Sequence, residues 1–296
     1  MRHTPKDWLL LLTLVAVWGS AFLLNQIALA SFPPTTLVAF RLMIGGLVLV
    51  VAMWFYQIPW HSSPILLGYF LVMAIMGNAL PYFLIAWGQQ YISSGLAGIL
   101  MAIMPLATLF LAHFFIPSEP LSGRRVIGFI LGFIGIIVLM GPQSLLEVAQ
   151  TSKTLLAQLA ILGGALCYAL GTVIARLRPE SDDLLTATMV LILASLVMLP
   201  TSLLVETPWF KPINIATTGA ITLLGLIATG LGTVLYFKLL RSAGATFLAQ
   251  MNYLIPVWAL AAGVIILNEQ VTTKALVALT IILLGIAISQ SHQLSE

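Results

Sequence analysis

Polar, aromatic and thioether side chains recur at helical spacing inside the long apolar stretches of this sequence, where they could bind a small molecule. Such spacing places several side chains on one face of a helix. Amide and hydroxyl groups cost free energy when they face lipid, so they turn toward the protein interior or toward water. The side chains that we expect to line a central binding cavity are Trp18, Asn25, Asn78, Tyr82, Met101, Tyr168, Gln250 and Tyr253.

Amide, hydroxyl and aromatic groups together suit a neutral or zwitterionic ligand. A zwitterion needs hydrogen-bond donors for its carboxylate and acceptors for its ammonium group, and amides and hydroxyls supply both. Aromatic faces attract the ammonium group or stack on an aromatic side chain. Two other roles stay open for the same residues, because polar side chains also hold membrane helices together and Trp and Tyr near helix ends form interfacial belts.

Of the 21 charged residues (12 basic and 9 acidic), only Arg41 lies clearly inside an apolar stretch. An intramembrane Arg suggests a functional site, but one near a helix end also reaches the lipid headgroups or caps carbonyls of a neighbouring helix. We therefore expect a structural charge at Arg41 and keep the binding role as the alternative. The apolar stretches contain no Asp or Glu, which disfavours a carboxylate proton carrier, and a single Arg disfavours phosphorylated substrates.

The sequence contains no cluster of residues suited to catalysis or to holding a cofactor. Its single cysteine, Cys167, cannot form an internal disulfide or a thiolate metal cluster. His113 has no second histidine or carboxylate close to it in sequence. We expect no catalytic residue, no metal site and no cofactor, and the net charge of +3 reflects membrane-edge Lys and Arg, not a nucleic-acid surface.

The elements that position the candidate residues are membrane-spanning helices. Hydrophobic residues make up 60% of the chain and charged residues 7%, against roughly 25% charged residues in a soluble domain. A helix needs about 20 apolar residues to cross the bilayer core of roughly 30 Å. Proline, glycine and charged residues divide the chain into ten such helices: 8–30, 35–56, 65–88, 94–116, 123–141, 154–176, 184–205, 214–239, 244–267 and 271–289.

The placement of basic residues predicts the orientation, because cytoplasmic links carry an excess of Lys and Arg. With the N-terminus inside, eight basic residues are cytoplasmic: Arg2, Lys6, Arg124, Arg125, Arg176, Arg178, Lys238 and Arg241. Three lie outside: Lys153, Lys211 and Lys274. We therefore expect both termini in the cytoplasm.

The second half of the chain repeats the first at an offset of about 150 residues. Pro105 and Glu119 are 14 residues apart, and Pro256 and Glu269 are 13 residues apart. Each half holds five helices, so the second half enters the membrane from the opposite side, as in many secondary transporters. The expected units are a first five-helix repeat at 1–141, an extracytoplasmic link at 142–153 and a second repeat at 154–296.

The duplicated Pro and Glu have distinct expected roles. Pro105 and Pro256 each remove a backbone hydrogen bond in mid-span, and the resulting kinks are either hinges or the shape that the cavity requires. Glu119 and Glu269 lie in links, where a carboxylate can satisfy the open amides of a helix N-terminus. We expect both Glu residues to be structural charges.

Several motifs resemble the EamA family of the drug/metabolite transporter superfamily. The first helix reads Trp18-Gly19-Ser20-Ala21-Phe22, similar to the family's W-G-s-n-F opening, and the second carries Ala39-Phe40-Arg41-Leu42. Both halves also carry a Pro, an apolar run, a Glu and a Gly-containing helix in the family's order. The chain departs from the family pattern at Asn268-Glu269, where Gly-Glu is common, and at Ser118-Glu119-Pro120.

The resemblance covers nearly the whole chain and extends to the YddG-type exporters of aromatic and other amino acids in bacterial inner membranes. It implies export of small metabolites, most directly amino acids, by alternating access. Without a titratable carrier in the membrane, we expect an uncoupled facilitator or exchanger, and cation coupling through backbone carbonyls stays open. The other candidates are a multidrug or nucleoside exporter of the same fold, and a membrane enzyme or sensor. The expected partners are the substrate and the bilayer, with no required oligomer.

Overall fold

The computed structural model describes residues 4–116, 123–140, 153–206 and 214–290, and every regular element within these ranges is helical. The elements are α1 (Pro5–Ala28), α2 (Pro34–Phe55), α3 (Pro64–Ala74), η1 (Ile75–Ala79), α4 (Leu80–Gly88), α5 (Ser94–Met101), α6 (Met104–Phe115), α7 (Gly123–Met140), α9 (Lys153–Leu177), α10 (Asp183–Val205), α11 (Ile215–Leu223), η3 (Leu224–Leu231), α12 (Gly232–Leu248), α13 (Met251–Leu267) and α14 (Thr273–Gln290).

These elements form ten spans, because α3–η1–α4, α5–α6 and α11–η3–α12 each make one interrupted helix. Eight spans are at least 18 residues long and strongly apolar, and the helices Met251–Leu267 and Thr273–Ser289 are shorter but also apolar. Large apolar side chains such as Trp54, Leu204 and Ile215 are 80%, 86% and 93% exposed. A surface of this kind faces lipid. The all-α membrane fold predicted from the sequence is therefore confirmed.

The third and eighth spans contain π-helical turns at matching positions, η1 and η3. The sequence predicted unbroken helices here. In η1 the backbone of Gly77 packs closely on Gly171 of α9, where an added Cβ would lie 2.9 Å from the Gly77 Cα atom. A π-helical turn inserts an extra residue and so rotates the face that follows it.

The fourth and ninth spans are interrupted near their prolines. α5 ends at Met101 and α6 begins at Met104, just before Pro105, whose nitrogen cannot donate to the preceding turn. In the second half, a turn at residues 249–250 precedes α13, which contains Pro256. The predicted helix 244–267 was wrong at its start, because Gly244 has a φ of 80° that regular helix does not allow.

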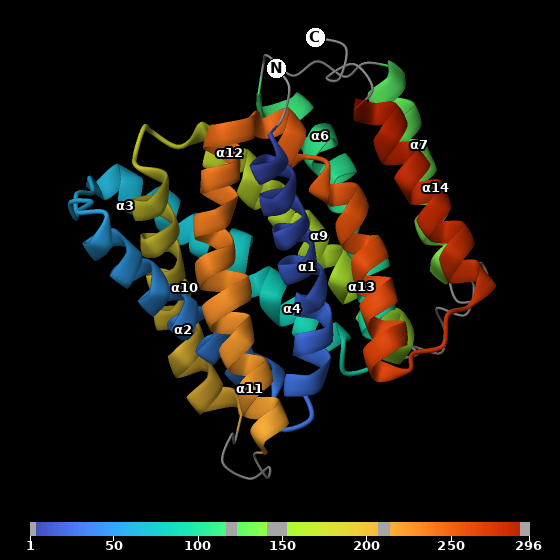
Figure 1. Cartoon of the computed structure of the whole chain (residues 1–296), viewed down its shortest axis with the longest axis horizontal. Helices are drawn as coiled ribbons and strands as arrows, with labels where there is room; N and C mark the ends of the chain where they lie inside the picture. The colour runs from blue at the N-terminus through green and yellow to red at the C-terminus, as the bar shows by residue number, and fades with distance from the viewer. Residues whose placement is uncertain (1–3, 117–122, 141–152, 207–213, 291–296) are drawn as a thin grey trace.

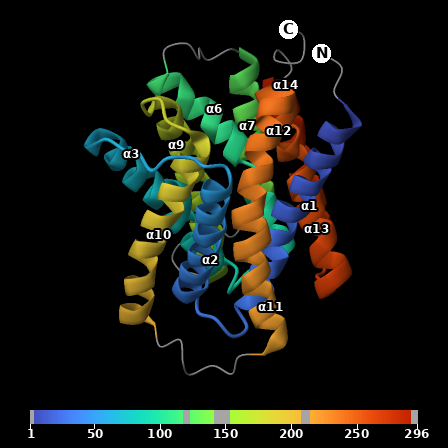
Figure 2. The same cartoon turned by 60° about the vertical axis from the view of Figure 1, so that its left-hand side comes forward.

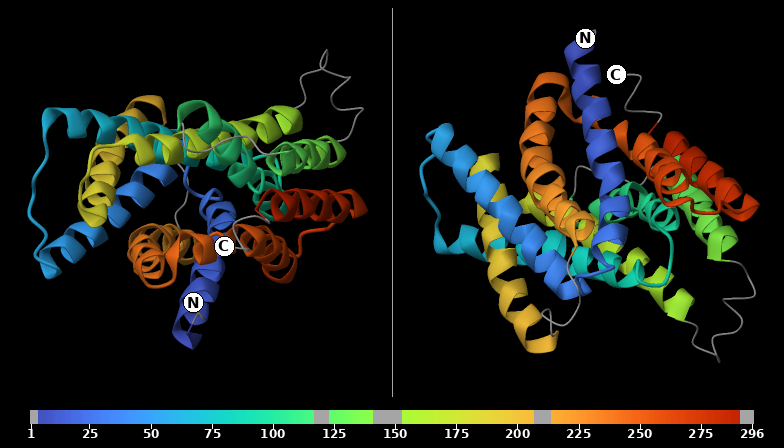
Figure 3. Two further views of the ribbon diagram at one scale, coloured as in Figure 1. Left: turned by 90° about the horizontal axis from the view of Figure 1, so that it is seen from above. Right: turned by 60° about the horizontal axis from the view of Figure 1, so that its bottom comes forward.

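Helices of the two halves pack against each other in pairs throughout the bundle. Helix α1 packs on α13, α2 on α10, and α4 on α9 (Figures 1 and 2). Helices α7 and α14 pair at one edge of the molecule (Figures 1 and 3), where Gly128 and Gly285 allow the two backbones to touch. Each of these pairs joins one helix from each repeat, so relative motion of the halves must reshape their interface.

The first turn of α1 and the last turn of α14 lie at the same end of the bundle, which we call the terminal face (Figure 1). The opposite end, the distal face, carries the links 29–33, 89–93 and 268–272. Helix α1 runs from the terminal to the distal face, whereas α9, the first helix of the second half, runs the other way. The inverted arrangement predicted from the odd helix number is present.

Candidate substrate-binding cavity

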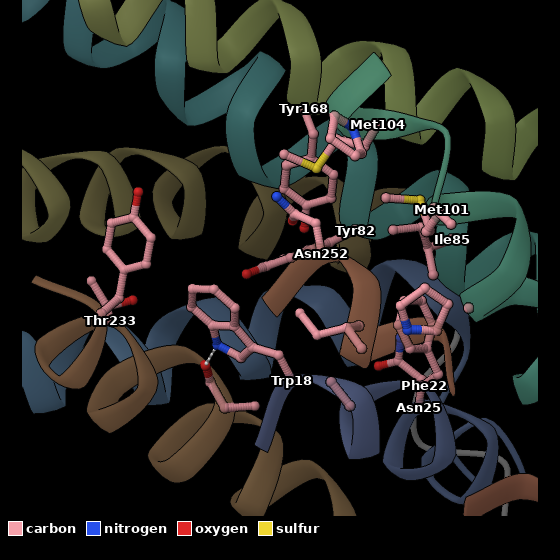
Figure 4. Close-up of a pocket in the computed structure, with 18 of the residues that line it drawn as sticks. Trp18, Phe22, Asn25, Tyr82, Ile85, Met101, Met104, Tyr168, Thr233 and Asn252 are labelled. Carbon is pink, nitrogen blue, oxygen red and sulfur yellow. Dashed lines mark hydrogen bonds between the residues drawn. The ribbon is translucent and has the colours of Figure 1, made fainter. Parts of the chain in front are cut away.

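A cavity of about 320 Å³ lies in the middle of the bundle, between helices of both halves (Figure 4). Its walls come from α1, α2, α4, α5, α6, α9, η3, α12 and α13. Small-molecule sites usually measure about 300–1,000 Å³, so this cavity suits a compact ligand. Most of its lining is apolar or aromatic, with a few amide, hydroxyl and guanidinium groups.

Residues at equivalent positions of the two repeats line this one cavity. The pairs are Trp18 and Tyr168, Tyr82 and Thr233, Ile85 and Tyr236, Met101 and Asn252, Met104 and Ile255, and Pro105 and Pro256, each 150 or 151 residues apart. The cavity therefore coincides with the pseudo-symmetric centre of the fold. This centre is where inverted-repeat transporters place their substrate.

Five of the eight expected cavity residues line the cavity: Trp18, Asn25, Tyr82, Met101 and Tyr168. The two proline positions also form part of its wall: Pro105 lies beside the break between α5 and α6, and Pro256 lies inside α13.

The other three expected residues lie elsewhere. The Asn78 amide, within η1, is 3.5 Å from the backbone carbonyl of Met73 on its own helix. Gln250 sits in the turn before α13, and Tyr253 packs on a buried apolar cluster around α5 and α14. None of the three lines the described cavity. The π-helical turn and the break before α13 change which face of each helix points inward, and simple helical spacing missed both.

The eight expected cavity residues do not include Thr233, Tyr236 and Asn252, which the structure brings to the cavity. An offset of 151 residues from Tyr82 and Met101, which were both expected cavity residues, reaches Thr233 and Asn252. Tyr236 lies three residues after Thr233 on the same helix.

Trp18 ties the first half of the chain to the π-helical turn of the second. Its indole nitrogen donates to the backbone carbonyl of Ala228 at 2.9 Å (Figure 4). Its ring lies 5.6 Å from that of Tyr236, centroid to centroid. A π-helical turn leaves carbonyls without their usual partner, and the indole satisfies one of them.

Arg41 turns into the bundle rather than toward the distal surface. Its Nε donates to Thr229 Oγ1 of η3 at 2.9 Å, and its guanidinium carbon lies 3.8 Å above the centre of the Tyr82 ring. The side chain is only 6% exposed, yet it lines the cavity. Among the residues that the structure describes, no carboxylate lies within ion-pair distance of Arg41.

An amide pair separates the cavity from a second hollow at the distal face. Asn25 Nδ2 donates to Gln89 Oε1 at 3.1 Å, and Gln89 Nε2 donates to the carbonyl of Phe22 at 2.8 Å. Asn25 lines the cavity, whereas the buried Gln89 borders the second hollow together with Gln26 and Glu269. Within the described chain, Asn25 Oδ1 has no hydrogen-bond donor.

Two carboxylates clamp the halves together at the distal face. Glu269, which follows α13, accepts from the backbone N–H and hydroxyl of Ser94 at 2.7 Å each and from the N–H of Gly95 at 2.9 Å. Glu206, which follows α10, accepts from the N–H groups of Thr35 and Thr36 at 2.9 and 2.8 Å. Each clamp binds the N-terminus of a first-half helix.

The sequence expectation for the two duplicated Glu residues has different outcomes. It placed Glu269 in the link before the tenth helix, where it could satisfy open helix amides, and in the structure its carboxylate accepts from the first residues of α5, the start of the fourth span. The equivalent Glu119 lies outside the described residues.

The model of the EamA-like transporter family matches the chain twice, over residues 6–141 and 155–290. The chain belongs to the EamA-like transporter family. The double match agrees with the repeat-equivalent residues that meet in the cavity. Family membership makes the protein a membrane transporter and not an enzyme, with a small-molecule substrate.

Relatives of this EamA-like chain align over nearly its whole length. A probable amino-acid metabolite efflux pump of Salmonella typhimurium is 27% identical, covering 96% of this chain and 94% of the relative. The uncharacterized transporter YvbV of Bacillus subtilis is 27% identical, covering 97% and 93%. One solved crystal structure has the same fold, with a TM-score of 0.68 at 18% identity and 96% coverage of both chains.

Proposed function

We propose that this EamA-like transporter exports small zwitterionic metabolites, and most directly amino acids, including aromatic ones. The supporting observation is the central cavity, which both repeats line with aromatic rings, amides and hydroxyls. Its volume of about 320 Å³ fits a compact metabolite better than a drug-sized molecule, since small-molecule sites extend to about 1,000 Å³. The relatives named as probable amino-acid metabolite efflux pumps, at 25–27% identity, agree with this proposal.

Alternating access is the proposed mechanism. The Asn25–Gln89 pair and the Glu269 clamp lie on the distal side of the cavity, where they would close the path to the distal face. Opening that face requires the second-half link to leave the first-half helix α5. Pro105, beside the break between α5 and α6, and Pro256, inside α13, are the proposed hinges, because helices bend most readily at proline.

The proposed transport is not coupled to protons. Among the described residues, no Asp or Glu lines the cavity, so no carboxylate there can carry a proton across. With the terminal face in the cytoplasm of a bacterial-type plasma membrane, the substrate enters from the cytoplasm and leaves at the distal face. The substrate gradient, or exchange for a second substrate, then supplies the driving force.

Uptake of labelled phenylalanine into proteoliposomes, with and without an imposed proton gradient, tests this proposal. We expect saturable uptake that excess unlabelled amino acids block and that the gradient leaves unchanged. An Ala21→Phe variant, whose larger side chain would occupy part of the cavity, should lose uptake. Leu196→Phe, on the exposed surface, should keep it.

Two results would contradict the proposal in different ways. Uptake that depends on the proton gradient would require a proton carrier and refute the uncoupled mechanism. Absence of phenylalanine uptake, combined with uptake of a nucleoside or a drug that Ala21→Phe blocks, would replace the amino-acid assignment by the corresponding substrate class.

A further inference from the structure

We propose that Arg41 is the subsite for the carboxylate of the substrate, so that this transporter selects compounds that carry a carboxylate. The inference rests on the proposed function and specifies it further. Zwitterions and simple monocarboxylates would both meet this requirement, whereas amines and amides would not.

The first argument is that the buried Arg41 guanidinium has no negatively charged partner in the described chain. Arg41 lies seven residues into α2, or about 10 Å along the helix from its distal end. Burial of a guanidinium in a membrane protein is costly without an anionic partner. The Tyr82 ring and the Thr229 hydroxyl offset part of that cost, but both are neutral. Within the described chain no carboxylate completes the site.

The second argument is the way the guanidinium is held. The bond from Nε to Thr229 fixes one edge of the group, and the Tyr82 ring fixes its plane. The two terminal amino groups have no acceptor among the described residues, and the side chain lines the cavity. A guanidinium with one edge fixed and its donors free suits bidentate binding of a planar carboxylate.

The third argument concerns the charge of the ligand. Arg41 is the only basic side chain on the described cavity wall, so a phosphate dianion would remain half uncompensated. Asn25, a residue 3% exposed, lines the same cavity, and its Oδ1 is buried without a donor in the described chain, so a rotation of the amide would present an acceptor to an ammonium group. The wall therefore offers one group for each end of a zwitterion.

Binding of three matched probes to purified protein in nanodiscs tests the inference. The probes are phenylalanine, phenylalaninamide, which lacks the carboxylate, and 3-phenylpropionate, which lacks the ammonium group. The wild type should bind phenylalanine and 3-phenylpropionate at least tenfold more tightly than the amide. Arg41→Gln should weaken binding of both carboxylates about ten- to a hundredfold and leave the amide unchanged.

Three further variants make the test decisive. Arg41→Lys keeps the positive charge but loses the paired N–H donors of the guanidinium, so its carboxylate affinity should lie between those of the wild type and Arg41→Gln. Thr229→Val removes the acceptor of the Arg41 Nε hydrogen bond, so the guanidinium is held less firmly and carboxylate binding should weaken several-fold. This variant tests the carboxylate subsite even if Arg41→Gln fails to fold. Arg241→Gln, on an exposed side chain away from the cavity, should bind all three probes like the wild type.

The outcomes separate this inference from the proposed function. Equal affinity of the wild type for phenylalanine and its amide, or carboxylate binding that is unchanged in Arg41→Gln and Thr229→Val, would overturn the carboxylate subsite but leave amino-acid transport standing. Arg41-dependent binding of 3-phenylpropionate without any binding of phenylalanine would support the subsite and overturn the amino-acid assignment. No binding of either carboxylate would overturn both.

Discussion

Replacing Glu269 with Gln should open the distal face of this transporter. The carboxylate joins the link after α13 to the first turn of α5, which belongs to the other repeat. Glutamine keeps the shape of the side chain but removes the charge, and one of its two acceptor oxygens becomes an NH₂ group that faces other donors. The variant should therefore weaken only the conformation in which this clamp is formed.

The free energy that the Glu269 clamp contributes to the closed conformation is estimated from its three hydrogen bonds, at 2.7, 2.7 and 2.9 Å. Hydrogen bonds to a charged group contribute about 1.5–3 kcal/mol, and a carboxylate at a helix N-terminus gains up to about 2 kcal/mol from the helix dipole. These contributions overlap, so we expect a net loss of about 2–3 kcal/mol. The ratio of distally open to distally closed molecules should then rise roughly 30- to 150-fold.

Labelling of a cysteine in the cavity measures this ratio. The single native cysteine is first removed as Cys167→Ala, and Met101→Cys then places a thiol on the cavity wall. A membrane-impermeant maleimide supplied only at the distal side should label the Glu269→Gln protein faster by up to the same factor. Glu180→Gln, which removes an exposed carboxylate, is the matched control and should label at the parent rate.

One result would refute this reasoning. If Glu269→Gln is folded and transports substrate, but its labelling rate changes less than about threefold, the clamp contributes under about 0.7 kcal/mol to closure. The distal barrier would then depend on other contacts, such as the amide pair that separates the two hollows.

Two further predictions follow from close contacts in the structure. Gly263→Ala should reproduce the faster labelling, because its Cβ would collide with the Glu269 carboxylate, whereas Gly219→Ala, with open space at its Cβ position, should behave like the parent. Trp18→Phe should lower the free energy of unfolding by about 0.5–1.5 kcal/mol, as measured by thermal unfolding. The variant loses the hydrogen bond to the Ala228 carbonyl but keeps an aromatic ring beside Tyr236. An unchanged melting temperature would show that water replaces the indole as the donor to this carbonyl.

Hydropathy and the internal repeat were sufficient to predict the ten spans and their inverted arrangement. A membrane span must be long and apolar, and both properties can be read from the sequence alone. Pro105, which cannot donate a backbone hydrogen bond, lies beside the break between α5 and α6, whereas Pro256 lies inside α13.

The finer geometry could not be predicted in the same way. A π-helical turn shifts the hydrogen-bond register without changing hydropathy, so helical spacing grouped Asn78 with Tyr82, whereas only Tyr82 lines the described cavity. The neighbours of Arg41 come from α4 and η3, and its distance from the helix end said nothing about either of them. Contacts between helices distant in sequence require the folded arrangement.

The paired positions around the cavity bear on how substrate preference can change. Of the six equivalent pairs, only Pro105 and Pro256 carry the same residue, whereas Met101 faces Asn252 in the alignment of the repeats and Tyr82 corresponds to Thr233. The proline is thus the same in both copies, whereas the other paired positions on the cavity wall have diverged. A point substitution at a diverged position changes the cavity wall on one side only and leaves both prolines in place, so we expect single mutations to be sufficient to change which molecules the cavity accepts.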